Sequence, residues 1–332
     1  MQELYKALSE RILILDGAMG TMLQAYNFTE EDFRGERFKD FHLSVKGNND
    51  MLSLTQPEAI AMIHGKYFAA GADIVETNTF SSTTIAMADY EMEDYVYDLN
   101  YASAKIAKEV AQSFTEKEPH KPRFVAGSIG PTNKTASMSP DVNDPGYRAV
   151  SFDELRVAYK QQVEALMDGG VDILLVETVF DTLNAKACLF AIEEVKEERN
   201  SDIPIMISGT ITDASGRTLS GQTAEAFLIS ISHIPLLSVG FNCALGASQL
   251  QPHLETIASK TTVGISAHPN AGLPNAFGEY DETPEQTASQ IKKYIDKNLV
   301  NIVGGCCGTT PAHIAAIAQL VEGITPRPIK LS

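Results

Sequence analysis

Two adjacent cysteines near the end of the sequence, Cys306 and Cys307, are the residues most suited to chemistry. They lie in V-N-I-V-G-G-C-C-G-T-T-P (Val300–Pro311), where an apolar run predicts a buried strand and Thr310-Pro311 predicts the start of a helix. A third cysteine, Cys243, ends another apolar run. Thiolates are soft ligands, and three of them with one open position are the arrangement of a catalytic rather than a structural zinc site.

The same cysteines also have plainer interpretations. Cys243 could be a small buried hydrophobe, and Cys306 and Cys307 could form a vicinal disulfide or an inert pair, because adjacent cysteines do not match the C-x-x-C spacing usual in zinc sites. Glycines at positions 304, 305 and 308 favour the metal, since we expect them to leave room for it. Cys188 lies inside a predicted helix and is expected to pack in the core.

The elements that must position these cysteines repeat a pattern of strand, loop and helix. Apolar runs of strand length alternate with amphipathic helical patterns, which is typical of a parallel sheet buried on both faces. Eight such units predict a (β/α)8 TIM barrel in a single domain over residues 1–332, and no Gly-x-Gly-x-x-Gly turn follows the first strand to favour an open doubly wound sheet. The predicted strands are Arg11–Gly17, Ala72–Phe80, Arg123–Gly130, Val171–Thr178, Ile203–Thr210, Leu236–Ala244, Thr262–His268 and Val300–Gly305.

Polar residues stand at the carboxyl ends of these strands, which in a barrel share the face that carries the active site. We therefore expect Asp16, Glu76, Glu177 and Asn270 to lie around the zinc site. Each carboxylate also has a structural interpretation: Asp16 as a turn residue, Glu76 as the cap of a neighbouring loop, and Glu177 in an ion pair. His268, beside Asn270, could border the site, but we expect it to be a hydrogen-bonded loop histidine. We expect His313, in the first turn of the last predicted helix, to be exposed.

Composition excludes several classes of protein. The net charge of −17, from 26 Lys and Arg against 43 Asp and Glu, argues against nucleic acid or an anionic membrane surface as a partner. The apolar runs are shorter than the roughly 20 residues of a membrane helix, and the charged N-terminus has no signal-peptide core. Four cysteines in 332 residues are no disulfide framework, so we expect a cytoplasmic protein.

At this point the motifs carry a family resemblance. F-N-C-A-L-G around Cys243 and G-G-C-C-G-T-T-P around Cys306-Cys307 resemble the two zinc-binding motifs of the homocysteine S-methyltransferase family. The likeness runs from about Arg11 to Val321. Further stretches that match the family are Leu15–Thr21, Glu76–Phe80, Gly130–Asn133 and Val176–Thr178. Three more resemble the homocysteine-binding module of cobalamin-dependent methionine synthases, namely Phe33–Phe38, Ile207–Gln222 and Ala267–Tyr280.

The resemblance implies a methyltransferase that uses zinc. Cys243, Cys306 and Cys307 would hold Zn²⁺ and homocysteine sulfur would take the open position, which Asn270 could fill while substrate is absent. The methyl donor would be methylcobalamin, recharged from 5-methyltetrahydrofolate by other modules, and the product methionine. Folate, cobalamin and reactivation modules are expected to be absent from this chain and to act as its partners. Betaine or S-methylmethionine is the alternative donor.

The amino-acid end of homocysteine needs partners of its own. Asp16 and Glu177 could hold its ammonium group by charge-assisted hydrogen bonds, and the resemblance implies the same two positions. For its carboxylate we expect the backbone N–H groups of Gly17 and Ala18 and the hydroxyl of Thr79. Two other classes stay open, namely a non-catalytic barrel with structural zinc and a phosphate-binding barrel that uses Gly304-Gly305 as a cradle.

Overall fold

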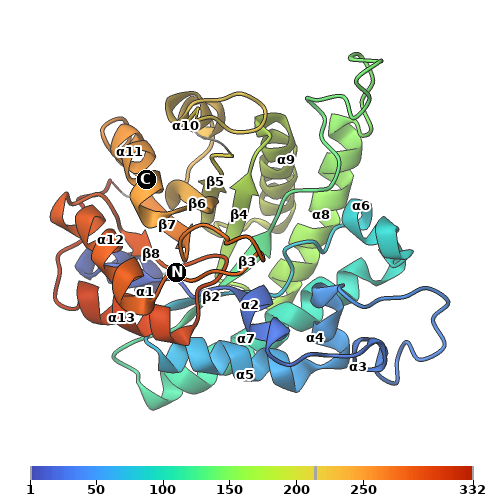
Figure 1. Ribbon diagram of the computed structural model, residues 1–332, viewed down its shortest axis with the longest axis horizontal. Helices are drawn as coiled ribbons and strands as arrows, with labels where there is room; N and C mark the ends of the chain where they lie inside the picture. The colour runs from blue at the N-terminus through green and yellow to red at the C-terminus, as the bar shows by residue number, and fades with distance from the viewer. Residues whose placement is uncertain (1, 213–214, 331–332) are drawn as a thin grey trace.

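The structure, a computed structural model, describes residues 2–212 and 215–330, so Asp213 and Ala214 of the stretch Ile207–Gln222 lie outside it. Its eight parallel strands are hydrogen-bonded in the order β1-β8-β7-β6-β5-β4-β3-β2, and an isolated parallel bridge from Leu15 to Ile74 joins the two end strands. The helices form a ring around the strands (Figure 1). The predicted single-domain (β/α)8 barrel is therefore confirmed as the fold.

Each predicted strand is present, with boundaries that differ by a few residues. Most observed strands are shorter than predicted, but β4, β6 and β7 continue slightly past their expected ends, where the site lies. The strands are β1 (Leu13–Ile14), β2 (Ile74–Glu76), β3 (Phe124–Ile129), β4 (Ile173–Val179), β5 (Ile205–Gly209), β6 (Ser238–Gly246), β7 (Gly264–Asn270) and β8 (Ile302–Val303).

The outer ring consists of the helices that follow the strands. They are α5 (Pro57–Ala69), α7 (Val96–Lys117), α8 (Phe152–Gly169), α9 (Thr182–Arg199), α10 (Ala224–Ile231), α11 (Ala247–Ala258), α12 (Pro284–Asp296) and α13 (Pro311–Val321). Shorter helices are α1 (Gln2–Glu10), α2 (Met19–Gln24), α3 (Glu30–Arg34), α4 (Leu52–Thr55) and α6 (Thr84–Met87), with 3₁₀ turns at Asn49–Met51, Ala88–Tyr90 and Glu93–Tyr95. No helix in the described ranges combines the length and hydropathy that crossing a bilayer requires.

Two apolar cores hold the barrel together. The larger one lies between the strands and the ring of helices and includes Cys188, which is buried as expected. The smaller one fills the inside of the barrel with side chains such as Leu13, Leu175 and Met206, and Leu4 of α1 closes it at the amino end. The barrel interior is thus packed near its amino end, which leaves the carboxyl ends of the strands for a cavity.

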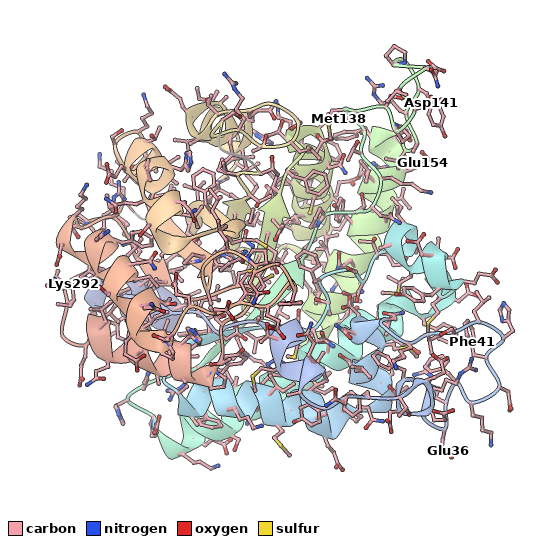
Figure 2. The ribbon with its side chains drawn as sticks, viewed as in Figure 1. Glu36, Phe41, Met138, Asp141, Glu154 and Lys292 are labelled. Atoms are coloured by element: carbon pink, nitrogen blue, oxygen red, sulfur yellow. The ribbon has the colours of Figure 1, made fainter. Side chains whose placement is uncertain are left out.

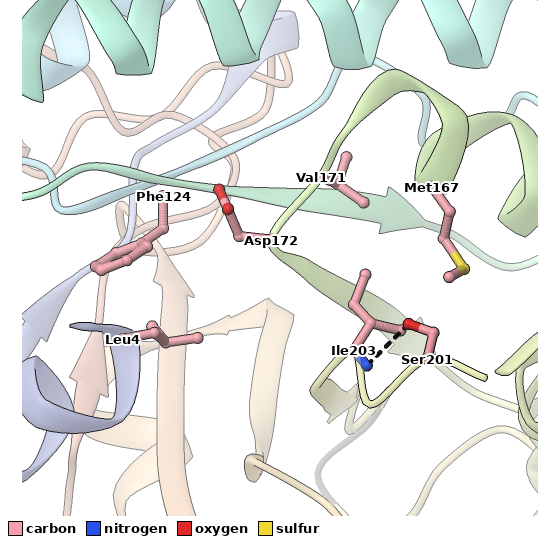
Figure 3. A pocket seen from close by; sticks show the side chains of 7 residues that line it. All are labelled: Leu4, Phe124, Met167, Val171, Asp172, Ser201 and Ile203. Carbon is pink, nitrogen blue, oxygen red and sulfur yellow. Dashed lines mark hydrogen bonds between the residues drawn. The ribbon is translucent and has the colours of Figure 1, made fainter. Parts of the chain in front are cut away.

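A small cavity of about 260 Å³ lies at the amino ends of β3, β4 and β5, next to α1 (Figure 3). Asp172 is the one carboxylate among the described residues that line it, and it accepts hydrogen bonds from Lys108 Nζ (2.5 Å) and from the backbone N–H of Val125 (2.9 Å). This carboxylate is therefore occupied in holding two segments together. At the opposite end, the long loop between β3 and α8 projects beyond the ring of helices, as the positions of Met138 and Asp141 in Figure 2 show.

Candidate active site at the carboxyl ends of the strands

The three cysteines singled out in the sequence come together at the carboxyl end of the barrel. Cys243 lies in β6, and Cys306 and Cys307 follow β8 after two glycines. The sulfur atoms lie within 4.8 Å of one another, with 3.8 Å between those of Cys243 and Cys307. All three are free thiols and partly buried. The geometry thus offers three sulfur atoms to one ion, and the identity of that ion stays a prediction.

Local irregularities of β6 aim Cys243 at the other two thiols. The pairing of β6 with β7 shifts register between Asn242 and Gly246, and Cys243 and Ala244 adopt left-handed backbone conformations with φ of 59° and 56°. Such conformations cost about 1–3 kcal/mol each for non-glycine residues and persist only where the surroundings impose them. A bulge of this kind re-aims a side chain near a strand end, which is its usual role beside active sites.

The glycines around Cys306 and Cys307 are required by close packing. A β-carbon at Gly304 would lie 2.6 Å from the carbonyl oxygen of Leu15, and one at Gly305 would collide with Thr309. Gly308 has φ of +80° and lies against Tyr280. Protein atoms therefore occupy the side of these glycines on which a side chain would stand, whereas Gly305 and Gly308 also line the cavity beside the thiols. That the glycines leave room for a metal stays a prediction.

Hydrogen bonds distribute charge unevenly among the thiols. Cys307 accepts hydrogen bonds from the thiols of Cys243 and Cys306 and from the hydroxyl of Tyr280. These hydrogen bonds lower its pKa. The pKa of Cys306 is raised by its hydrogen bonds with Cys243 and Cys307, and the hydrogen bond with Cys307 also raises the pKa of Cys243. The cluster therefore favours one thiolate that accepts hydrogen bonds from its neighbours.

A second cluster of polar side chains lies beside the thiols. Asp16 follows β1, Glu76 ends β2, Glu177 lies in β4 and His268 in β7. One ligand atom from each of Glu76, Glu177 and His268 lies within 4.8 Å of the others. Asp16 joins them through its Oδ2, which accepts a hydrogen bond from the backbone N–H of Glu76 (3.1 Å). Sequence-distant carboxylates thus converge as expected from their places at strand ends.

Burial governs the protonation of this second cluster. Desolvation raises the pKa of Asp16, Glu76 and Glu177, and the negative charge of Glu177 raises the pKa of Asp16 and Glu76 further. Desolvation also lowers the pKa of His268 to about 3, so its imidazole is neutral. Buried carboxylates without a cationic partner are costly, and they bind protons or a cation in return.

Both clusters line one cavity of about 740 Å³. Its wall also includes Asp50 and Glu279, the aromatic rings of Phe80, Tyr90 and Tyr280, and the start of α2. Among the described residues that line it, none is a lysine or an arginine. A cavity of this size, lined by carboxylates and without a lysine or arginine among its described residues, can hold a small ligand that carries an ammonium group.

The residues expected to bind the substrate carboxylate lie in the cavity wall but are partly engaged. The backbone N–H of Ala18 donates to Thr309 Oγ1 (3.2 Å), and the hydroxyl of Thr79 donates to the carbonyl oxygen of Ser128 (2.7 Å). Gly17 lies in the wall as well. Among these three predicted donors, only the backbone N–H of Gly17 has no hydrogen-bond acceptor in the described part of the chain.

Asn270, the predicted fourth ligand, ends β7 and is buried. It is anchored next to the cysteine loop, because the neighbouring backbone N–H of Ala271 donates to the carbonyl oxygen of Cys307 (2.9 Å). Its Oδ1 has no hydrogen-bond partner within the described part of the chain, although Asn270 does not line the cavity. Its role as a ligand therefore stays a prediction.

The preferred interpretations of the two histidines are wrong, whereas the alternative that His268 borders the site agrees with its place in the cavity wall. His268 is not a loop residue: it lies in β7, is 1% exposed, and lines the cavity. Polar residues at alternate positions (Ser266, His268, Asn270) were the signal that this strand continues with one polar face inward. His313 is buried rather than exposed, because its Nδ1 accepts a hydrogen bond from the backbone N–H of Thr310 (3.2 Å) and its Nε2 lies 2.8 Å from the carbonyl oxygen of Glu282.

Comparison with known proteins adds a family and a fold. The family model for homocysteine S-methyltransferase matches residues 13–321. Among solved structures, the metallated form of the homocysteine methyltransferase MmuM from Escherichia coli is similar at 24% identity and a TM-score of 0.72, with 93% of this chain and 96% of that chain covered. Its oxidized form gives 23% identity, a TM-score of 0.72 and coverage of 93% and 95%. At these identities the structural likeness supports the barrel fold.

Proposed function

Because this chain belongs to the homocysteine S-methyltransferase family, we propose that it transfers a methyl group to the thiolate of homocysteine, giving methionine, at a zinc ion held by Cys243, Cys306 and Cys307. The observation that carries the proposal is the convergence of three sulfur atoms, all within 4.8 Å of one another, on the wall of a cavity that also presents carboxylates. Three soft donors from two strand ends fit zinc with one position left for substrate. The ion would bind the homocysteine thiol as a thiolate at neutral pH, and three anionic sulfur ligands would keep that sulfur nucleophilic.

The carboxylates beside the thiols would orient the substrate. Asp16 and Glu177 would accept hydrogen bonds from its ammonium group. Glu177 is suited to this because Ser128 Oγ donates to its Oε1 (2.5 Å) and Asn242 Nδ2 donates to its Oε2 (3.3 Å), which holds the carboxylate in one orientation. The Gly17 amide would donate to the substrate carboxylate, with Ala18 and Thr79 shaping the wall around it.

For the methyl donor we propose methylcobalamin, recharged from 5-methyltetrahydrofolate by folate- and cobalamin-binding modules that would act as partners of this barrel over residues 1–332. The stretches Phe33–Phe38, Ile207–Gln222 and Ala267–Tyr280, which resemble methionine synthases, support this choice. The cavity wall includes the exposed Gly278 and Glu279 of the loop after β7, so a docked donor could approach the cavity from this loop.

A cationic donor is the second candidate, because one feature of the cavity favours it. Phe80, Tyr90 and Tyr280 line the cavity together with carboxylates, and aromatic faces beside negative charge are what bind sulfonium or quaternary ammonium groups. Turnover of homocysteine with methylcobalamin, betaine and S-methylmethionine in parallel separates the two. Activity with betaine or S-methylmethionine and none with methylcobalamin would overturn our choice of donor.

The zinc assignment is tested by removing one sulfur. Cys243→Ala should lower the zinc content and abolish methyl transfer while far-ultraviolet circular dichroism stays that of the barrel. The matched control is Cys188→Ala, which removes a buried thiol of α9 far from the site and should keep both zinc and activity. Full activity in Cys243→Ala would show that this residue is not a ligand.

A further inference from the structure

The charge in the cavity is one-sided. Its described wall carries three thiols and five carboxylates, and no lysine or arginine balances them; the carboxylates are Asp16, Asp50, Glu76, Glu177 and Glu279. The proposed zinc ion and the ammonium group of one homocysteine offset only part of this charge. Buried anions need protons or cations, so the cavity has capacity for a further cation.

Glu76, Glu177 and His268 form the place where such a cation fits. One carboxylate oxygen from each glutamate and one imidazole nitrogen lie within 4.8 Å of one another. The Nδ1 of His268 lies 3.9 Å from Glu76 Oε1. This spacing is too long for a direct hydrogen bond and leaves room for an ion between the groups.

Unpartnered polar atoms point to the same place. His268 is 1% exposed and lines the cavity, and it has two ring nitrogens: Nδ1 lies toward Glu76, and Nε2 has no hydrogen-bond partner among the residues that the structure describes. Oδ1 of Asp16, which is 3% exposed and lines the same cavity, has no partner there either. A neutral imidazole has one nitrogen lone pair to offer a metal, and Nδ1 is the nitrogen that lies toward Glu76. Buried polar atoms without partners are rare and call for a bound species.

The carboxylate of Glu177 is held as metal-binding carboxylates usually are. Asn242 Nδ2 and Ser128 Oγ donate to its two oxygens. Asn242 is itself fixed, because its Oδ1 accepts hydrogen bonds from Ser208 Oγ (2.7 Å) and from the backbone N–H of Thr178 (2.9 Å). Partners of this kind orient ligands and raise metal affinity.

We propose that Glu76, Glu177 and His268 form a second divalent-cation site, beside the three cysteines, whose occupant competes with the ammonium group of homocysteine. Two carboxylates and one imidazole are ligands of intermediate hardness that accept Mn²⁺, whereas the all-sulfur site selects zinc. Competition follows because Glu177 would serve both cations, and this part rests on the proposed placement of the substrate ammonium at Asp16 and Glu177. Excess divalent metal would therefore inhibit the enzyme by raising the KM for homocysteine.

The test is a titration of the zinc-loaded protein with MnCl₂, in which electron paramagnetic resonance measures free Mn²⁺. We expect saturable binding of one equivalent. L-Methionine, which has the ammonium and carboxylate of the substrate but no thiol, should weaken Mn²⁺ binding, and N-acetyl-L-methionine, which lacks the ammonium group, should not. Absence of saturable binding to the zinc-loaded protein overturns the proposal, and equal effects of the two compounds overturn the competition.

Variants locate the bound ion. Glu76→Gln should weaken Mn²⁺ binding by more than about tenfold, since even outer partners of a metal cost that much. The matched control is Asp50→Asn, which removes a buried carboxylate charge from the same cavity outside the cluster and should leave Mn²⁺ binding unchanged. Equal losses in both variants would mean that only the general field of the cavity attracts Mn²⁺. Because no turnover is measured, this result is independent of whether Cys243→Ala retains activity.

Discussion

Replacing Glu177 by glutamine tests the substrate-binding role of this carboxylate most directly. The change removes the negative charge and keeps the shape. A hydrogen bond to a charged group contributes about 1–3 kcal/mol, so the Kd for homocysteine should rise by about 5- to 150-fold. The Glu177→Gln variant should fold, because both hydrogen bonds of this side chain can be kept. The new amide N–H₂ can donate to the hydroxyl of Ser128, which can accept as well as donate. The amide oxygen can still accept from Asn242.

Isothermal titration of the zinc-loaded variant with L-homocysteine measures this loss, with zinc content and thermal unfolding recorded for each sample. The matched control is Glu279→Gln, because Glu279 lines the same cavity from the exposed loop after β7. It changes the net charge equally and should leave the Kd within about twofold, as expected of a screened surface charge. An unchanged Kd in Glu177→Gln, or the same loss in Glu279→Gln, would refute the assignment of Glu177 to the ammonium group.

Two further predictions concern stability. Desolvation raises the pKa of Asp50 to about 6, so the stability provided by its neutral form is fully present below about pH 4 and is lost as the pH rises through 6. Asp50→Asn should therefore be more stable than the parent by up to about 3 kcal/mol at pH 8 and equal to it at pH 4 in urea unfolding; the same difference at both pH values would contradict the reasoning. Gly308→Ala combines a left-handed φ of +80° with a clash against Tyr280, whereas Gly221→Ala has φ of +94° and open space around it. Gly308→Ala should thus lower the Tm by more than Gly221→Ala does and reduce zinc content as well, and equal shifts would mean that backbone strain alone matters.

Much of the fold could be predicted because its signals are local. Helix α13 begins at Pro311 as expected, since proline suits the first turn of a helix. The strands are recognisable because parallel strands covered on both faces are continuously apolar. Once eight such units are counted, the barrel follows, and its topology alone brings Asp16, Glu76, Glu177 and the cysteines to one face.

The parts that could not be predicted depend on pairing between distant segments. The shift in the pairing of β6 with β7 decides that Cys243 takes a left-handed conformation and meets Cys307. The buried His313 has its Nε2 2.8 Å from the backbone carbonyl oxygen of Glu282, which lies on another segment. Nothing in the sequence around either residue reports which segment will lie beside it.

The amino-acid sequence by itself thus determined the barrel, the end of the barrel at which chemistry occurs, and the residue types available there, because hydrophobic periodicity and strand ends are properties of short segments. Only the tertiary structure decided which side chains face one another. It placed His268 beside Glu76 and Glu177, left the cavity without a balancing lysine or arginine among its described residues, and packed protein atoms against the glycines. The physical reason is that distances between side chains and the cost of burying their charges arise only when distant segments pack together.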